Sequence, residues 1–273
     1  MKGVSAVRKL AINLHAKAGL DTATYIATMK QVGFEALFTN TPSRTELDVI
    51  ANALAANGMH YEMIHAPFGH INDIWLAGER GDAMLREMLD AVDAAAAAGG
   101  VPIVVIHLSS GKTPPAVSEV GCARYDRLVD YAAKKGVRLA FENQRFLFNF
   151  EWAMRRFANA PHVGFCWDCG HEGCFTPDVA FMPDYGKRLL GTHLHDNSRL
   201  PDADDHKIPF DGRINFSHVA QQIRGSGYKG TLTLEVFAGN SRSYDQMTCT
   251  AFLEQAAIAA KRIRRMVDGF DWS

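Results

Sequence analysis

Four residues able to bind a metal or carry a proton stand at the ends of apolar, strand-like segments. The segments 138–143, 164–168, 190–193 and 231–235 place Glu142, Asp168, His193 and Glu235 at or near their ends. Buried carboxylates and imidazoles are costly unless they are paired or bound to a cation. Because four successive segments end in this way, we expect the four side chains to meet at one divalent metal.

Three carboxylates and one imidazole form a hard, oxygen-rich ligand set. Mn²⁺ is the preferred ion for such a set, with Mg²⁺, Co²⁺ or Zn²⁺ as alternatives. Three negative charges around one dication raise the proton affinity of at least one carboxylate. A glutamate tuned in this way can exchange protons with a substrate near neutral pH. Open positions on the metal can chelate adjacent oxygens of a sugar and stabilise an enediolate.

Strand-like and helix-like patterns alternate along the whole chain, which is typical of βα units around a parallel sheet. The expected strands are 9–15, 34–39, 59–65, 102–107, 137–142, 163–168, 190–195 and 230–236. The expected helices are 21–32, 43–57, 80–98, 116–135, 150–158, 178–189, 215–226 and 243–267. An open doubly wound sheet would need a glycine-rich phosphate loop after an early strand, and segment 15–20 lacks one. We therefore predict a (β/α)8 TIM barrel forming a single domain over residues 1–273.

The carboxyl ends of all strands of such a barrel face one side, where catalytic groups collect. These ends hold His15, Asn40, His65, His107, Glu142, Asp168, His193 and Glu235. A single strand-end histidine can simply bond a neighbouring loop, which is our interpretation of His15. The complete set is different, because so many ionisable groups around one rim repel or stay unsatisfied without a cation.

Composition limits the classes of function. The chain has 273 residues, 47% hydrophobic and 22% charged, with a formal net charge of −1. These values suit a globular enzyme and give no electrostatic reason to expect nucleic acid or an anionic membrane as partner. No apolar run reaches the roughly 20 residues that cross a bilayer, and the first nine residues lack a signal-like apolar core. We expect a cytoplasmic protein whose five cysteines are free thiols.

The site motifs resemble those of the xylose-isomerase-like barrels, the superfamily that groups sugar phosphate isomerases/epimerases with family 2 apurinic endonucleases. The resemblance covers nearly the whole chain. It rests on Phe-Glu-Asn at 141–143, Asp-x-x-His at 168–171, His-x-x-Asp at 193–196 and Leu-Glu at 234–235. The segment 209–214 resembles the family's Pro-Gly-x-Gly loop, with Phe210 in place of the first glycine.

Resemblance to the ketose 3-epimerases implies roles for individual residues. Glu142 and Glu235 would bind the metal and transfer protons on opposite faces of the substrate, while Asp168 and His193 complete the metal site. The residues expected to contact substrate are His65, His107, His171, Arg199, His206 and Trp75. For Trp75, packing is an equal alternative. The expected activity is isomerisation or epimerisation of a ketose or polyol-derived substrate by proton abstraction next to a carbonyl, through a metal-bound enediolate.

Resemblance to endonuclease IV gives a rival with three zinc ions. Its ligand groups would be His65, His107 and Glu142; then Glu142, Asp168, His193 and Glu235; then His171, Asp204 and His206. Binding to a DNA backbone needs several Lys or Arg contacts. The segment 200–211 carries one lysine against four aspartates, so we favour a small sugar or polyol as partner over nucleic acid.

Two further alternatives stay open. A metal-dependent dehydratase or lyase of the same superfamily would use the same enolate chemistry, since loops choose among these reactions. A catalytically inactive scaffold is disfavoured by the complete ligand set. The phenylalanines at 146, 148 and 150 are a candidate surface for a homo-oligomer.

Overall fold

Eight parallel strands form the centre of the molecule in a computed structural model that describes residues 7–99 and 101–269. The strands are β1 (Leu10–Asn13), β2 (Ala36–Asn40), β3 (His60–His65), β4 (Ile103–Ile106), β5 (Arg138–Glu142), β6 (Val163–Asp168), β7 (Leu189–His193) and β8 (Leu232–Leu234). They follow one another in chain order, and β1 pairs with β8. Between β7 and β8 the ladder is reduced to a bridge from Leu194 to Leu234, which completes the barrel.

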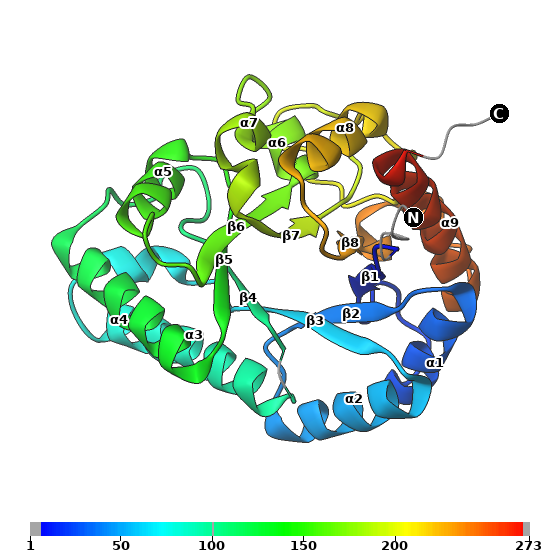
Figure 1. The fold of residues 1–273 in the computed structure, drawn as a ribbon, viewed down its shortest axis with the longest axis horizontal. Coiled ribbons are helices and arrows are strands. Elements are labelled where there is room, and N and C mark those ends of the chain that lie inside the picture. Colours follow the sequence, from blue (N-terminus) through cyan, green and yellow to red (C-terminus); the bar gives the residue numbers. More distant parts are fainter. Residues whose placement is uncertain (1–6, 100, 270–273) are drawn as a thin grey trace, which may run out of the picture.

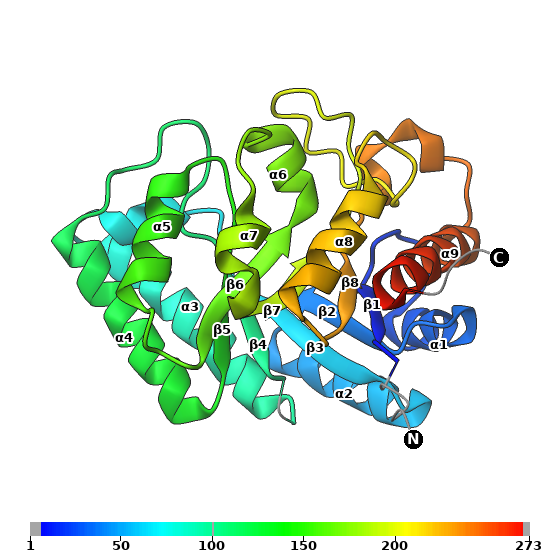
Figure 2. The same ribbon diagram turned by 45° about the horizontal axis from the view of Figure 1, so that its top comes forward.

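Helices surround the ring of strands on the outside, as the two views in Figure 1 and Figure 2 show. They are α1 (Thr22–Val32), α2 (Arg44–Asn57), α3 (Glu79–Ala97), α4 (Glu119–Lys135), α5 (Leu147–Arg156), α6 (Cys169–Phe175), α7 (Phe181–Tyr185), α8 (Phe216–Ser226) and α9 (Cys249–Asp268). Short 3-10 turns are η1 (Ile71–Trp75), η2 (Gly186–Arg188), η3 (Ala238–Asn240) and η4 (Arg242–Tyr244). The predicted (β/α)8 barrel is confirmed.

Local sequence explains where several helices begin and end. Asp21 accepts the backbone N–H groups of Ala23 and Thr24 at the start of α1. Ser43 and Glu46 form a reciprocal capping box at the start of α2, which satisfies N–H groups that have no partner inside the helix. Gly136 ends α4 with a φ of 70°, a backbone conformation that glycine adopts without strain.

The apolar core has two parts. A small cluster of Phe38, Met63, Ile103, Val105, Ala140 and Cys166 fills the barrel interior below the strand ends. A larger cluster packs the outer faces of the strands against the helices. Because the interior is filled by side chains, the polar residues at the strand ends form the floor of a site rather than the wall of a channel.

The expected elements differ from the observed ones mainly after β6. The sequence pattern predicts a helix over 178–189, whereas the chain forms α6 directly after Asp168 and then α7 with the η2 turn. Asp168 itself caps α6 by accepting the His171 N–H at 2.7 Å. The last expected helix, 243–267, begins later at Cys249, because 242–244 form a separate turn.

The five cysteines are free, as expected. No helix in the described residues is long and apolar enough to cross a bilayer. The prediction of one domain over 1–273 includes residues 1–6, 100 and 270–273, which lie outside the described ranges.

Candidate active site

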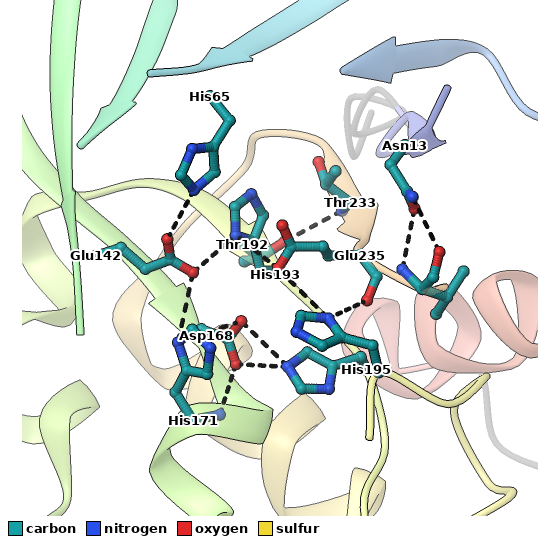
Figure 3. A network of polar contacts seen from close by, with 12 residues as sticks. Asn13, His65, Glu142, Asp168, His171, Thr192, His193, His195, Thr233 and Glu235 are labelled. Atoms are coloured by element: carbon teal, nitrogen blue, oxygen red, sulfur yellow. Dashed lines mark hydrogen bonds and ion pairs between the residues drawn. The ribbon is translucent and has the colours of Figure 1, made fainter. Parts of the chain in front are cut away.

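Glu142, the last residue of β5, is the centre of the predicted cluster and is completely buried. Its Oε2 lies 2.8 Å from His107 Nε2 and 3.3 Å from His65 Nε2. Its Oε1 lies 2.9 Å from His193 Nδ1. One carboxylate therefore joins side chains from β3, from the residue after β4, and from β7, as the convergence of strand ends predicts. Figure 3 shows Glu142 between His65 and His193.

Asp168 and Glu235 lie on either side of this centre. Glu235 Oε2 is 3.3 Å from His193 Nδ1, so His193 stands between the carboxylates of Glu142 and Glu235. Asp168 is fixed by Asn143: the amide of Asn143 donates to the Asp168 carbonyl, and the Asp168 N–H donates to the amide oxygen, both at 2.8 Å. These bonds couple the ends of β5 and β6.

A second ring of ligand-type residues lies beside the first. Asp204 Oδ2 is 3.4 Å from His171 Nε2, and Asp204 Oδ1 is 3.3 Å from His206 Nε2. His195 is completely buried, with Nε2 3.0 Å from Asp168 Oδ1, and its ring stacks on that of His206 at 4.0 Å. This ring adjoins the cluster of Glu142 through Asp168.

Backbone carbonyls fix the orientation of three of the imidazoles. Nδ1 of His65 lies 2.8 Å from the carbonyl oxygen of Ala66. Nδ1 of His171 lies 3.0 Å from the carbonyl oxygen of Asn143, and Nδ1 of His206 lies 3.0 Å from that of Glu235. A carbonyl only accepts, so Nδ1 carries the proton in each ring and the Nε2 lone pair of a neutral ring faces the cluster. Metal-binding histidines are held in this way.

The residues present fit divalent metals. Three groups have ligand atoms within 4.8 Å of one another: His65, His107 and Glu142; Glu142, Asp168, His193 and Glu235; and His171, His195, Asp204 and His206. Among the described residues, His195 Nδ1 and Asp204 Oδ1 are buried polar atoms without a satisfactory hydrogen bond. Unsatisfied buried polar atoms are costly, and a cation near Asp204 would offset that cost.

The protein groups alone shift one another's proton affinities strongly. Burial raises the pKa of Glu142, but the charges of His193 and His107 outweigh burial and hold that pKa well below its usual range. Burial lowers the pKa of His171, but Asp168 and Asp204 raise it to about 10; in His206, burial is likewise overcome, mainly by Asp204, and the pKa rises to about 9. The low pKa of Glu142 is opposite to that of a base tuned near pH 7, because His193, whose own pKa is raised well above its usual value, lies 2.9 Å from the Glu142 carboxylate and favours its charged form. Burial lowers the pKa of His107 instead.

A cavity of about 320 Å³ opens at this end of the barrel. Its lining residues include His65, His107, His171, His206 and Glu235, together with Phe68, Phe175 and Phe237. The volume lies at the lower end of the roughly 300–1,000 Å³ usual for small-molecule sites. Aromatic rings beside polar groups suit the apolar and hydroxylated faces of a sugar.

Two residues expected to contact substrate lie elsewhere. Trp75 is only 1% exposed; it packs on Tyr125 and Trp152, and its indole donates to the Leu108 carbonyl. Of the two alternatives for Trp75, substrate contact or packing, its position corresponds to packing. Arg199 has a φ of 56° and lines a separate cavity beside Glu172 and His218. The backbone turn at Arg199 directs its side chain away from the cluster.

Several residues of the site were not predicted, among them Arg145, Gln144 and His195. Arg145 lines the cavity, with its guanidinium 3.6 Å from the centre of the Phe175 ring and bonded to Asp202 at 3.0 Å. Gln144 lies 3.1 Å from His107 Nε2. His195 could have been found from strand alternation, because residues two apart, such as His193 and His195, point to the same face.

The loop carrying Asp204 and His206 is anchored by Asp196. Its carboxylate accepts four backbone N–H groups, those of Asn197, Phe210, Gly212 and Ile214, at 2.8–2.9 Å. Phe210 takes a φ of 79°, which a glycine adopts more easily, and its ring packs under Arg262. The replacement of glycine at 210 therefore leaves the left-handed turn in place.

Comparison with known proteins defines the class. Residues 12–266 match the family described as xylose isomerase-like TIM barrel, and the chain belongs to that family. An uncharacterised protein of Sinorhizobium fredii is 27% identical over 171 residues, which are 58% of this chain and 53% of that protein. An uncharacterised protein of Methanocaldococcus jannaschii is 24% identical over 194 residues, 63% of each chain. The matches thus span about half to two thirds of these curated relatives.

Solved structures with the same fold include sugar epimerases. D-Psicose 3-epimerase from Clostridium cellulolyticum, solved with D-tagatose, has a TM-score of 0.77 at 14% identity, covering 95% of this chain and 99% of that one. The 3-keto-D-glucoside 4-epimerase of E. coli has a TM-score of 0.74 at 16% identity, covering 93% and 99%. D-Allulose 3-epimerase from Methylomonas, in complex with D-allulose, has a TM-score of 0.74 at 16% identity, covering 94% of this chain and 97% of that one. At these identities the likeness establishes the fold alone.

Proposed function

We propose that the chain is a divalent-metal-dependent isomerase or epimerase acting on a ketose or another keto derivative of a sugar or polyol. The observation that carries the proposal is the meeting of Glu142, Asp168, His193 and Glu235 at the floor of a cavity of small-molecule size. The four side chains would hold one ion, preferably Mn²⁺. The ion supplies positive charge for the oxyanion that forms when a proton leaves the carbon beside a carbonyl.

The chain's own residues divide the remaining work. Glu235 lines the cavity and is 7% exposed, so its carboxylate is the group best placed to exchange a proton with substrate. Glu142 lies just below, and its proton transfer would pass beside His107, which lines the cavity. His171 and His206 face the same space and would hold substrate oxygens. Phe68 and Phe175 add apolar surface to the wall of the cavity.

Proton exchange tests this assignment directly. In D₂O, the manganese-loaded protein should exchange the proton beside the carbonyl of a ketose such as D-fructose, followed by NMR. Glu235→Gln should lower the exchange rate by at least 100-fold, as expected for loss of a general base, while the fold measured by circular dichroism is kept. Asp130→Asn is the matched control, because Asp130 is exposed on α4 and does not line the cavity. Exchange at the normal rate in both Glu235→Gln and Glu142→Gln would refute the roles of these carboxylates.

Cleavage of a phosphodiester by three metals is the second candidate, because the three ligand groups share Glu142 or adjoin at Asp168. The surface charges oppose it. Lys112 and Arg145 both pair with Asp202, and Lys207 pairs with Asp205, so basic side chains near the cavity are already neutralised. Elemental analysis separates the candidates: about one manganese-type ion supports the isomerase, whereas three zinc ions with cleavage of abasic duplex DNA support the endonuclease.

A lyase or dehydratase would share the proton-abstraction step. Solvent exchange with recovery of a sugar of unchanged mass supports isomerisation or epimerisation. Loss of water or a shortened carbon chain, detected by mass spectrometry, supports elimination instead.

A further inference from the structure

A second, larger cavity adjoins the candidate active site. An open groove of about 780 Å³ lies over the residues that follow β1 and β8. Asp204, His206 and Phe237 line both this groove and the 320 Å³ cavity. Because these three residues line both spaces, the two cavities adjoin at them, and a molecule whose reacting part lies by Glu235 would reach the groove by passing over these side chains.

The groove has a firm floor built from two loops. The Ala238 N–H donates to the Ala16 carbonyl at 2.8 Å, and Lys17 Nζ donates to the Tyr244 carbonyl at 2.9 Å. The Cys249 thiol contacts the Lys17 carbonyl at 3.5 Å. These bonds tie the loop after β1 to the loop after β8, so the groove is part of the folded barrel and is formed before any ligand arrives.

The side chains of the groove suit a neutral molecule rich in hydroxyl groups. Within the described part of the chain, the side chains of Asn240 and Asp245 are exposed and form no hydrogen bond with another residue. An amide and a carboxylate can together accept from and donate to neighbouring hydroxyls. Phe237, half-buried at the junction, offers an aromatic face for the C–H groups of a ring.

The charges of the groove disfavour a phosphate. Asp204 and Asp245 carry negative charge, against the ammonium of Lys17, which already donates to the Tyr244 carbonyl, and the ring of His206, which already pairs with Asp204 at 3.3 Å. His15 adds an imidazole, held by Thr22 Oγ1 at 3.2 Å. A dianion in this groove would face two carboxylates, whereas a sugar ring meets acceptors and one aromatic face.

We propose that the groove is a subsite for a second sugar ring, so that the substrate is a glycoside with a ketose-type reacting end rather than a free monosaccharide. This inference rests on the proposed function, since it assumes that the reacting end lies beside Glu235. The second ring lies over Phe237, with its hydroxyls on Asn240 and Asp245.

Two probes separate the subsite from the chemistry. The first compares deuterium exchange into D-fructose, D-fructose 6-phosphate and the disaccharide maltulose, which is glucose linked to fructose. We expect kcat/KM for maltulose to exceed that for D-fructose at least tenfold. The second compares calorimetric binding of maltitol and glucitol, polyols that have no carbonyl and cannot react. We expect maltitol to bind at least tenfold more tightly.

Variants locate the effect. Asn240→Ala and Asp245→Asn should each lower the maltitol-to-glucitol affinity ratio at least threefold, while the control Asp130→Asn keeps the ratio of the parent protein. Equal binding of maltitol and glucitol, or a preference for D-fructose 6-phosphate, would overturn the subsite. Selective maltitol binding that the variants weaken, without exchange into any keto sugar, would support the subsite and refute the isomerase.

Discussion

The metal-free protein should lose stability as pH rises above neutrality. Without a cation, the carboxylates of the site are compensated by protonated imidazoles. Asp168 and Asp204 raise the pKa of His171 to about 10, and chiefly Asp204 raises that of His206 to about 9, each against the opposing effect of burial. The pKa of His193 is also raised well above its ordinary value, by Cys166, Glu235 and Glu142, again against burial.

The sign and size follow from proton linkage. An unfolded histidine has a pKa near 6.5, so between pH 7 and 8 the folded protein holds protons that the unfolded chain has mostly released. The stabilisation that comes from a histidine whose pKa is raised in the folded state is complete below about pH 6.5, the pKa in the unfolded chain. This stabilisation is lost as the pH rises toward the pKa of the folded state. Each linked proton therefore costs about 1.4 kcal/mol per pH unit. For His171, His193 and His206 together, the loss between pH 7 and 8 lies at about 1.4–4 kcal/mol.

Urea unfolding of chelator-treated protein at pH 7.0, 7.5 and 8.0 measures this loss. The matched variant Asp204→Asn removes the carboxylate that His171 and His206 share. Its free energy of unfolding should therefore vary less steeply with pH, with a slope that corresponds to about one to two fewer linked protons than in the parent protein. Buried thiols contribute equally to both proteins and cancel in the difference. Adding Mn²⁺ should reverse the trend, since higher pH frees the imidazoles to bind metal. A metal-free free energy of unfolding that stays level or increases between pH 7 and 8 would refute this account of the cluster, as would equal slopes in both proteins.

Three other outcomes follow from the same contacts. Binding of Mn²⁺ at pH 7.5 should release protons from the imidazoles that bind it. We expect about one proton when only the group containing His193 is occupied and about three when all three groups are occupied. Calorimetry in buffers of different ionisation enthalpy measures this number. Asn143→Ala should lower the free energy of unfolding by about 2–4 kcal/mol, because it removes two buried hydrogen bonds to the Asp168 backbone. Asp196→Ala should cost about 3–5 kcal/mol and loosen the loop at 204–214, because four N–H groups lose their acceptor; hydrogen exchange of those amides reports it.

Each of these has a specific contrary result. Metal binding without proton release would mean that the imidazoles are neutral before the metal arrives. A loss of less than about 1 kcal/mol in Asn143→Ala would contradict the hydrogen-bond explanation. For Asp196→Ala, unchanged exchange at Gly212 and Ile214 would show that the loop holds its shape without the carboxylate. Asp130→Asn is the surface control for all the unfolding measurements.

Position at a strand end was sufficient to predict which side chains converge at the centre of the candidate site. Glu142, Asp168 and His193 end their strands, and Glu235 follows β8, so the barrel itself brings them together. The contacts of His193 with Glu142 at 2.9 Å and with Glu235 at 3.3 Å follow from topology more than from any local detail. A periodicity of two along each strand carries this information, and it is visible in the sequence.

Loop residues were predicted less well, for a physical reason. The direction of a loop side chain depends on one or two backbone dihedrals that sequence patterns do not determine. Arg199 sits at a φ of 56° and turns to another cavity, whereas Arg145, next to the start of α5, reaches the cavity by stacking on Phe175. Trp75 belongs to the 3-10 turn η1, and its bond to the Leu108 carbonyl fixes it inside the core.

The ring of His171, His195, Asp204 and His206 links the two parts of the functional proposal. Asp204 and His206 line both the cavity beside Glu235 and the groove over β1 and β8, so any molecule that spans the two must pass them. A cation held there would narrow the passage and present positive charge to the substrate, whereas protonated imidazoles would present donors to its hydroxyls. Under the proposed function, occupancy of this ring would therefore determine which substrates reach Glu235 across the groove. We therefore expect the preference for maltulose to change with the number of protons that metal binding releases. The ratio of maltulose to D-fructose exchange should differ between protein loaded at all three groups and protein loaded only at the group containing His193.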